Sequence, residues 1–332
     1  MALYKQWNAQ RLRGEGTYWQ ARILSTAVHL EVFDWLEKRA NGSRDAANYF
    51  GGTQEGWEIF LDALSAMGLL QKRARRYENS LFAHSYLCSG QGSFLLAEHD
   101  AWNLWTTLPD ILTTGKRPKI SQPFFTDRKR TERLLQSLDY DGRKIAPYLI
   151  KRLPLSRSKT FLDVGGGLGS FALAWCRQFR HLRATVVEHP RVVPFARRAV
   201  ENARMTKRVQ VIALNILTHP LPKGFDLVLI SNVLHGQGCS ENRALLKNAY
   251  RCLNRGGQIV LRDVLMKQAG RNANWGALFS VSLLLHTPNG RCYALDEVRD
   301  WLHQAGFSRI RGPFRSSPLS FDPDSILIAE KR

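Results

Sequence analysis

Glycine occupies every second position, 165, 167 and 169, in the segment Gly165-Gly166-Gly167-Leu168-Gly169, where position 166 is a glycine too. An acid, Asp163, stands just before this segment. The apolar run 160–164 predicts a strand, and the residues after the glycines have the spacing of a helix. Glycines between a strand and a helix let the chain turn sharply and let its backbone approach a ligand closely. The arrangement predicts a site for a nucleotide-like cofactor at the carboxyl edge of a parallel sheet.

Two further chemical groups follow strand-like runs. Glu188 ends the run 184–188, and a carboxylate there can accept hydrogen bonds from both hydroxyls of a ribose. His235 follows the run 225–231, which should point its ring into the cleft beyond the sheet. A neutral imidazole can take a proton from a phenol or an alcohol and so make the oxygen a better nucleophile. A histidine that is structural, or that only orients a substrate, is the alternative interpretation.

Strand and helix patterns alternate from residue 160 onward. Buried strands read as near-continuous apolar runs, so the pattern predicts an α/β fold with a Rossmann-like, mostly parallel sheet of seven strands covered on both faces. The last two strands follow one another without a helix, so the last strand should run antiparallel. The strands are expected at 160–164, 184–188, 209–213, 225–231, 257–263, 307–314 and 324–330, and the helices near 169–180, 190–203, 240–254 and 294–305.

The N-terminal part has a different, mostly helical pattern that ends in a hairpin with a basic tip, Lys72-Arg73-Ala74-Arg75-Arg76. Three helices and a hairpin form a winged-helix pattern, which raises the question of DNA binding. The third helix carries Glu55, Glu58 and Asp62 but no Lys or Arg, which disfavours contact with phosphates. The helices are expected as one long amphipathic helix over 18–40 and shorter ones at 43–50 and 53–67, and the hairpin at 69–79.

The string Leu162-Asp163-Val164-Gly165-Gly166-Gly167-Leu168-Gly169 resembles motif I of class I S-adenosylmethionine (SAM) methyltransferases. It is most similar to the small-molecule O-methyltransferase family of the caffeic acid and acetylserotonin enzymes. A dinucleotide-binding loop would have Gly or Ala where this chain has Ser170. The run from Gly56 to Leu70 resembles the dimerisation domain that precedes the catalytic domain in the same family. An antiparallel last strand is likewise a feature of the methyltransferase sheet that the usual dehydrogenase sheet lacks.

The resemblance covers roughly residues 18–330 and implies an organisation and a set of partners. It implies a winged-helix dimerisation domain at 1–90, a helical connector at 91–150 that contributes to the substrate pocket, and a SAM-binding methyltransferase domain at 151–332. The implied cofactor is S-adenosyl-L-methionine, with S-adenosyl-L-homocysteine as product and no metal. The implied assembly is a homodimer that acts on a small-molecule acceptor.

The resemblance also implies roles for single residues. His235 falls on the general base, and Asp263 falls on the acid that orients it. Asn215 stands where the family has an acid at the adenine amino group, and its carbonyl oxygen can accept the same hydrogen bond. The implied cofactor-binding residues are Asp163, Gly165, Gly166, Gly167, Gly169, Glu188, Asn215, Ile216 and Ser231. The implied pocket-lining residues are Trp102, Trp105, Phe124, Phe125, Phe279, Leu283 and His286.

The chain departs from the family pattern near the expected base. Gly236 and Gln237 follow His235 where the family has Asp-Trp, and Cys292 stands where the family has a second acid. Methylation of a nitrogen or a carbon atom instead of an oxygen therefore stays an alternative.

Charge is unevenly distributed along the 332 residues, whose formal net charge is +20. Residues 1–150 carry 20 Lys and Arg against 16 Asp and Glu, and residues 151–332 carry 28 against 12. The excess of positive charge in the second half can attract an acidic substrate, a nucleic acid or an anionic membrane. Alternatively, these basic residues simply form a solvated face. No apolar run approaches a membrane span, and the N-terminus is too polar for a signal peptide. The five cysteines show no metal-binding or disulfide-dense spacing, which favours a reducing cytoplasm.

Two rival functions fit the sequence less well. A nucleic-acid methyltransferase that acts on amino groups usually has a Pro-Pro segment after the fourth strand, but this chain has Ser231-Asn232-Val233-Leu234. No cysteine follows a proline, which argues against methylation at cytosine carbon 5. A non-catalytic SAM-binding regulator would need the winged helix to bind DNA. The sequence therefore favours SAM-dependent O-methylation of a small aromatic or polyketide-like hydroxyl, with nucleic acid an unlikely partner.

Overall fold

A computed structural model describes residues 17–88, 99, 102–119, 127–266, 274–315 and 324–332. The chain folds into two compact units, Met1–Trp102 and Asn103–Arg332. The three-part division expected from the sequence, with its connector at 91–150, stays a prediction. Phe124 and Phe125 lie outside the described residues.

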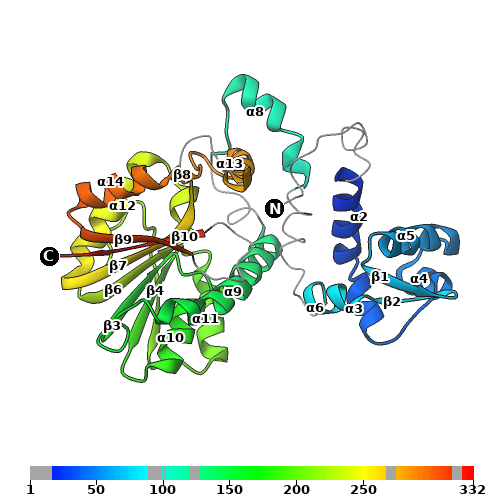
Figure 1. The fold of residues 1–332 in the computed structure, drawn as a ribbon, viewed down its shortest axis with the longest axis horizontal. Coiled ribbons are helices and arrows are strands. Elements are labelled where there is room, and N and C mark those ends of the chain that lie inside the picture. Colours follow the sequence, from blue (N-terminus) through cyan, green and yellow to red (C-terminus); the bar gives the residue numbers. More distant parts are fainter. Residues whose placement is uncertain (1–16, 89–98, 100–101, 120–126, 267–273, 316–323) are drawn as a thin grey trace. The chain divides into compact units, whose positions relative to one another are not determined.

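The first unit consists of short helices and a hairpin (Figure 1). These elements pack around one apolar core. The large side chains of Phe33, Leu61, Leu64 and Tyr77 are almost fully buried there. The Thr53 hydroxyl caps a helix by accepting a hydrogen bond from the Gly56 amide at 3.1 Å. The helices are α2 (Tyr18–His29), α3 (Val32–Glu37), α4 (Ser43–Phe50), α5 (Gln54–Ala66) and α6 (Leu81–Tyr86), and the hairpin strands are β1 (Leu70–Arg73) and β2 (Arg76–Asn79).

The single helix expected over 18–40 is wrong, because the chain breaks between α2 and α3. Glu31 adopts a left-handed backbone with φ 58° and ψ 32°, which no Gly or Pro in the sequence announces. The change of direction brings Val32 and Phe33 into the core, where both are almost completely buried. Core packing therefore overrides the continuous helical periodicity.

Acids within the same unit pair with two of the four basic residues of the hairpin tip. Lys72 contacts Asp62 of α5 at 2.6 Å, and the Tyr77 hydroxyl donates to the same carboxylate at 2.7 Å. Arg73 pairs with Glu78 at 3.2 Å. Lysine and arginine side chains that are already paired are poorly placed to bind phosphates, so these contacts argue against a DNA-binding wing.

The second unit is built on the expected sheet. Its strands lie in the order β5-β4-β3-β6-β7-β10-β9, and all neighbours are parallel except β10, which runs antiparallel to both β7 and β9. The Rossmann-like, seven-stranded, mostly parallel sheet with an antiparallel last strand is confirmed, and a short additional strand, β8, pairs with β7. The strands are β3 (Thr160–Val164), β4 (Arg183–Glu188), β5 (Val209–Ala213), β6 (Phe225–Ser231), β7 (Leu253–Met266), β8 (Tyr293–Ala294), β9 (Ser308–Arg315) and β10 (Asp324–Glu330).

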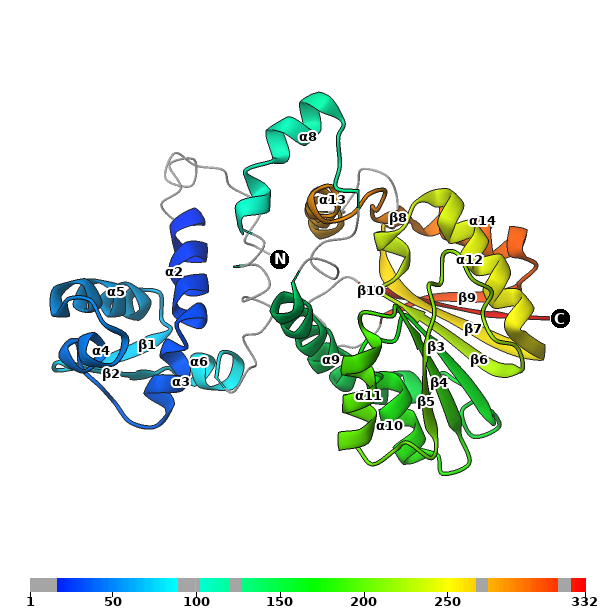
Figure 2. The same ribbon diagram turned by 180° about the vertical axis from the view of Figure 1, so that it is seen from behind.

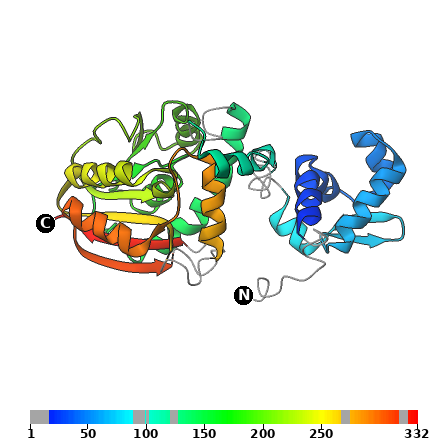
Figure 3. The same ribbon diagram turned by 90° about the horizontal axis from the view of Figure 1, so that it is seen from above.

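Helices cover both faces of this sheet (Figures 1 and 2). On one face, Trp175 and Leu149 pack on strand residues such as Phe161. On the other face, Leu246 and Trp301 pack on the strand residues that point to that side. Two helices, α8 and α13, contact each other outside these layers (Figure 3). The helices are α8 (Leu108–Thr114), α9 (Arg128–Ile150), α10 (Ser170–Gln178), α11 (Val193–Asn202), α12 (Cys239–Cys252), α13 (Asn274–His286) and α14 (Leu295–Ala305), with a 3-10 turn, η1 (Leu234–Gly236).

Ser170, at the start of α10, bonds α9 to the glycine loop. Its buried hydroxyl donates to Asp139 Oδ1 at 2.6 Å, and a Cβ at Gly142 would lie only 2.8 Å from the Ser170 Cβ. Because the bond joins a buried hydroxyl to a carboxylate, we expect Ser170→Ala to lower the free energy of unfolding by about 1–3 kcal/mol. Chemical denaturation should show this loss, with Ser240→Ala at an exposed position as the matched control. Equal stability of the two variants would contradict the assignment.

Candidate active site

The parallel sheet brings the expected functional residues to one edge. Strands β3, β4, β6 and β7 are neighbours, so their carboxyl ends meet at the same side of the sheet. The order reverses at β3, because β4 lies on one side of it and β6 on the other. In open α/β sheets this switch point is where ligands bind.

The glycine loop after β3 has a backbone that other residues would strain. Gly167 adopts a φ of 57°, in the left-handed region. At Gly166 a Cβ would lie 2.6 Å from the carboxyl carbon of Asp163, so a side chain has no room there. Gly165 and Gly169 also have positive φ angles, as the predicted tight turn requires.

Glu188, at the end of β4, bonds directly to this loop. Its Oε1 accepts a hydrogen bond from the Gly167 amide at 2.9 Å, and its Oε2 accepts one from the His189 amide at 2.7 Å. Burial raises the pKa of Glu188 to about 7, although both amides act to lower it. Each carboxylate oxygen can accept a second hydrogen bond, so the side chain can still bind a ribose.

Asp163 lies under the loop with its charge uncompensated. It is 1% exposed, and neither carboxylate oxygen accepts a well-formed hydrogen bond within the described part of the chain. Burial raises the pKa of Asp163 to about 7 and the negative charge of Glu188 adds to the rise, while the backbone amide of Ala172 acts to lower it. A buried carboxylate with so little compensation is costly, and a positively charged ligand would relieve that cost. This donor set suits a cationic cofactor.

The other expected cofactor residues lie at the same edge. Asn215 follows β5, and its Oδ1 accepts a hydrogen bond from the Leu217 amide at 3.0 Å. Ile216 is half-buried and packs on the core. Ser231 ends β6, and its hydroxyl accepts a hydrogen bond from Arg262 at 3.1 Å. Their contacts with a cofactor stay predictions.

His235 and Asp263 form a bonded pair. The Asp263 Oδ1 lies 2.7 Å from His235 Nδ1, and Oδ2 accepts a hydrogen bond from the Leu234 amide at 2.9 Å. Burial alone would raise the pKa of Asp263, but the charge and hydrogen bond of His235 and the neighbouring amides hold that pKa below its ordinary value. The carboxylate therefore stays ionised and fixes the ring, so Nε2 is the nitrogen that would take a proton.

A small apolar cluster adjoins His235. The Phe279 ring lies edge-on to His235, with centroids 5.0 Å apart, and packs with Leu283 and Cys292 beside Val264. Cys292, at the position of the family's second acid, is fully buried, and burial raises its pKa to about 11. The side of the His235 ring that faces Phe279 is thus apolar.

The remaining pocket-lining predictions are untested. His286 ends α13 with Nδ1 2.7 Å from the Ser282 carbonyl of its own helix. Trp102 belongs to the first unit, where it packs on Tyr18 and Arg22 of α2. Trp105 lies in the second unit and is 38% exposed.

Sequence reasoning missed two residues near the edge of the sheet. Arg262 is only 3% exposed, although it is charged and sits next to Asp263. Its signal in the sequence is an arginine that interrupts the apolar run Ile259-Val260-Leu261. Asn232 follows β6 with a left-handed φ of 56°, and such strain in a non-glycine residue often marks functional sites.

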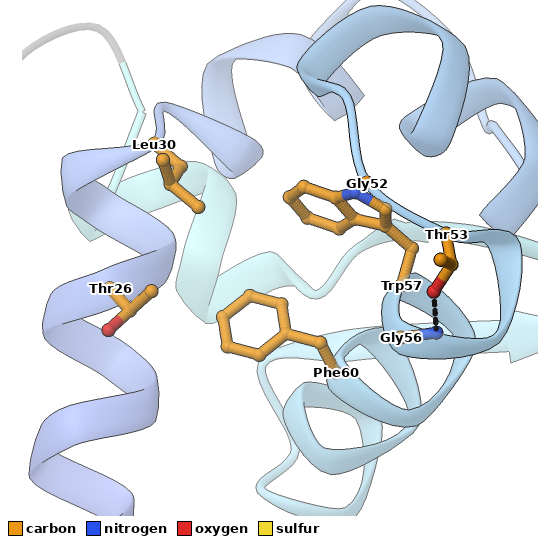
Figure 4. Close-up of a pocket in the computed structure, with 7 residues that line it drawn as sticks. All are labelled: Thr26, Leu30, Gly52, Thr53, Gly56, Trp57 and Phe60. Carbon is orange, nitrogen blue, oxygen red and sulfur yellow. Dashed lines mark hydrogen bonds between the residues drawn. The ribbon is translucent and has the colours of Figure 1, made fainter.

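Two further features belong to the first unit alone. A pocket of about 260 Å³ between α2 and α5 is lined mainly by apolar groups such as Leu30, Trp57 and Phe60 (Figure 4). Glu37, His84 and Cys88 have potential metal-binding atoms within 4.8 Å of one another. Burial raises the pKa of the Cys88 thiol to about 11, which disfavours the thiolate that binds metals, and we assign no metal site.

Known families and proteins resemble both units. The model of the O-methyltransferase domain matches residues 120–308, and the model of the O-methyltransferase dimerisation domain matches residues 16–89. The 3-hydroxy-5-methyl-1-naphthoate 3-O-methyltransferase of Streptomyces sahachiroi is 30% identical over 309 residues, which cover 90% of this chain and 89% of that protein. The tetracenomycin polyketide synthesis 8-O-methyl transferase TcmO of Streptomyces glaucescens is 28% identical, covering 95% of this chain and 94% of its own.

A solved structure shares the fold. The human N-acetylserotonin methyltransferase in complex with SAM superimposes with a TM-score of 0.84 at 20% identity, covering 100% of this chain and 99% of that one. Among the described residues, no helix has both the length and the apolar character that crossing a membrane requires.

Proposed function

Because this chain belongs to the O-methyltransferase family, we propose that it transfers the methyl group of SAM to a hydroxyl of a small aromatic or polyketide-like acceptor. The names of the two relatives, a naphthoate methyltransferase and an enzyme of tetracenomycin polyketide synthesis, support this acceptor class. One observation carries the proposal. The acids at the glycine loop and the His235–Asp263 pair lie near the carboxyl ends of neighbouring strands of one sheet.

The residues of this chain divide the work. SAM, when bound, supplies a methyl group activated by a positively charged sulfur. Asp163 provides the negative charge that holds a cationic cofactor, and Glu188 binds its ribose. His235 takes the proton of the acceptor hydroxyl on Nε2, and Asp263 stabilises the resulting imidazolium. The remaining rate acceleration comes from holding the acceptor oxygen in line with the methyl group of the cofactor.

The first unit serves to form a homodimer in this proposal. It matches the dimerisation model and exposes large apolar side chains on α2 and α5, with Trp19 57% and Ile59 66% exposed. A partner chain would cover them, and light scattering should give about twice the mass of 37.8 kDa. The five cysteines are free, and we propose the reducing cytoplasm as the compartment.

The purified protein should bind SAM and methylate a flat aromatic hydroxyl. We expect calorimetry to give a Kd for SAM between about 1 µM and 1 mM, the usual range for enzyme substrates. Methyl-labelled SAM should then transfer its label to members of a panel that contains a hydroxynaphthoate, the matching neutral naphthol, an aromatic amine and duplex DNA. The naphthoate and naphthol arms test whether the positive charge of the chain favours acidic acceptors.

The same experiment separates the alternatives. Label on the amine alone would support N-methylation, and label on DNA would overturn the small-molecule assignment. Well-folded protein that takes up neither SAM nor S-adenosyl-L-homocysteine would remove the proposed function altogether.

A further inference from the structure

The turn that presents His235 departs from the family pattern. Gly236 and Gln237 follow the base, where the resembling family has Asp-Trp. Gly236 has no side chain, and the turn is only three residues long. Its geometry therefore depends on its own backbone hydrogen bonds, from Gly236 to Val233 and from Gln237 to Leu234, and on contacts with other parts of the chain.

The amide groups of the turn are bound by the orienting acid. Asp263 Oδ2 accepts hydrogen bonds from the Leu234 amide at 2.9 Å and from the His235 amide at 3.4 Å. One carboxylate thus holds both the ring and the backbone of the base. Within the turn the Gln237 amide donates to the Leu234 carbonyl at 3.1 Å. A carbonyl oxygen can accept a second hydrogen bond, so side chains outside the turn can still bind its carbonyl groups.

Asn242 of α12 supplies the first donor. Its side-chain amide donates to the Leu234 carbonyl at 2.9 Å and, at a longer 3.5 Å, to the Gln237 carbonyl. Asn242 is 0% exposed, although asparagine is a poor helix former and burial of its amide is costly. Neither helix propensity nor the burial of a polar amide favours asparagine at this position, so its hydrogen bonds to the turn account for its presence.

Tyr293 of β8 supplies the second donor. Its hydroxyl donates a short hydrogen bond to the Gln237 carbonyl, just after the turn. The ring is 1% exposed and lies edge-on to Trp301, with centroids 4.8 Å apart, so the hydroxyl has little freedom to move. Burial raises the pKa of Tyr293 well above its ordinary value, which keeps the hydroxyl protonated and able to donate.

Gly290 closes the turn from a third side. A Cβ at this position would collide with the carbonyl oxygen of His235 and with the Thr287 hydroxyl. The Thr287 hydroxyl accepts a hydrogen bond from the Gly290 amide at 2.9 Å, which fixes the approach. The backbone of the base is therefore enclosed by α12, β8 and the loop after α13.

We propose that Asn242 and Tyr293 are positioning residues that hold the His235 turn through these hydrogen bonds. This inference rests on the proposed function, because the base is the group they act through. Tyr293 fixes the end of the turn and Asn242 its beginning, so the imidazole keeps its contact with Asp263 and its aim at the acceptor. A displacement of about 1 Å at a reacting group can cost a factor of about 100 in rate.

Tyr293→Phe tests this with a minimal change, since it removes only the hydroxyl. We expect kcat to fall about tenfold, within the range that misplacement of a base allows, while the Kd for SAM stays unchanged. Tyr250→Phe is the matched control, because the Tyr250 ring also packs edge-on to an aromatic neighbour, Phe307, at 5.1 Å. Asn242→Leu should act like Tyr293→Phe, and Asn242→Ser, which keeps a donor, should recover part of the rate.

A double variant distinguishes positioning from a general loss of structure. If Tyr293 acts through His235, then Tyr293→Phe should slow the wild type but not a protein that already carries His235→Ala. An equal loss in both backgrounds, or a kcat of Tyr293→Phe equal to that of Tyr250→Phe, would overturn the inference.

NMR keeps the inference separate from the proposed function. The titration of the His235 ring proton should shift in Tyr293→Phe relative to wild type and to Tyr250→Phe, whether or not an acceptor is known. Identical titration curves in all three proteins would overturn the positioning role. Absence of methyl transfer in the wild type would instead count against the proposed function.

Discussion

The His235→Ala variant is expected to transfer methyl groups at least about 100-fold more slowly than the wild type, because removal of a general base typically costs a factor of 10² to 10⁴. The Kd for SAM should change little, since the cofactor acids lie on β3 and β4 and the base follows β6. A fall in kcat with an unchanged Kd would place His235 in the chemical step.

Two further variants sharpen this prediction. His303→Ala removes an exposed histidine at the end of α14 and should leave kcat unchanged. Asp263→Asn keeps the shape of the side chain but removes the charge that stabilises the imidazolium, so its kcat should fall between those of the wild type and His235→Ala. Unchanged turnover in His235→Ala would remove the base and leave orientation of the acceptor as the role of the ring.

The strands of the catalytic unit could be predicted because of their burial. The observed ranges of β3, β5, β6 and β10 equal the predicted ones, since strands covered on both faces read as continuous apolar runs. The predicted range 257–263 was shorter than β7, which runs from Leu253 to Met266. The extra residues at its start, Leu253-Asn254-Arg255-Gly256, have no strand signal, and pairing of Leu253 with Phe225 of β6 makes them part of the sheet.

Features decided by tertiary contacts could not be predicted in this way. The break at Glu31 follows from the burial of Val32 and Phe33, and β8 is a strand of two residues that exists only because it pairs with β7. Hydrogen bonds from a side chain to the backbone of another element, such as that from Asn242 to the Leu234 carbonyl, produce no periodicity or motif in the sequence. The candidate site was therefore predictable where it depends on strand ends and uncertain where it depends on packing.

Asp163→Asn should have opposite effects on stability and on cofactor binding. The wild-type carboxylate is buried without a well-formed hydrogen bond in the described residues, so its neutral replacement should raise the free energy of unfolding of the free protein at pH 8 by about 1–3 kcal/mol. The same change removes the negative charge under the glycine loop. We expect the Kd for SAM to rise about tenfold or more, the size of a lost charge-assisted contact.

The raised pKa of Asp163 determines whether stability and SAM affinity rise or fall with pH. The pKa of Asp163 is raised to about 7 in the folded protein, so its contribution to stability is full at low pH and is lost as pH rises through 7. The melting temperature of the free wild type should therefore fall relative to that of Asp163→Asn between about pH 5 and pH 8. Binding of the cation favours the ionised carboxylate, so the wild-type affinity for SAM should increase over the same interval.

Asp226 provides a control of opposite sign. Burial acts to raise the pKa of Asp226, but hydrogen bonds from Asn254, Lys159 and Thr160 together lower that pKa by more, so the net shift is downward. Asp226→Asn should accordingly destabilise the protein at pH 8 and leave the affinity for SAM unchanged, because Asp226 lies at the amino end of β6, away from the glycine loop. Differential scanning fluorimetry from pH 5 to pH 9, with and without SAM, measures all three proteins together. If Asp163→Asn melted below the wild type at pH 8, or bound SAM equally well, the buried acid would be a structural group, and the cation-binding role assigned to it would be wrong.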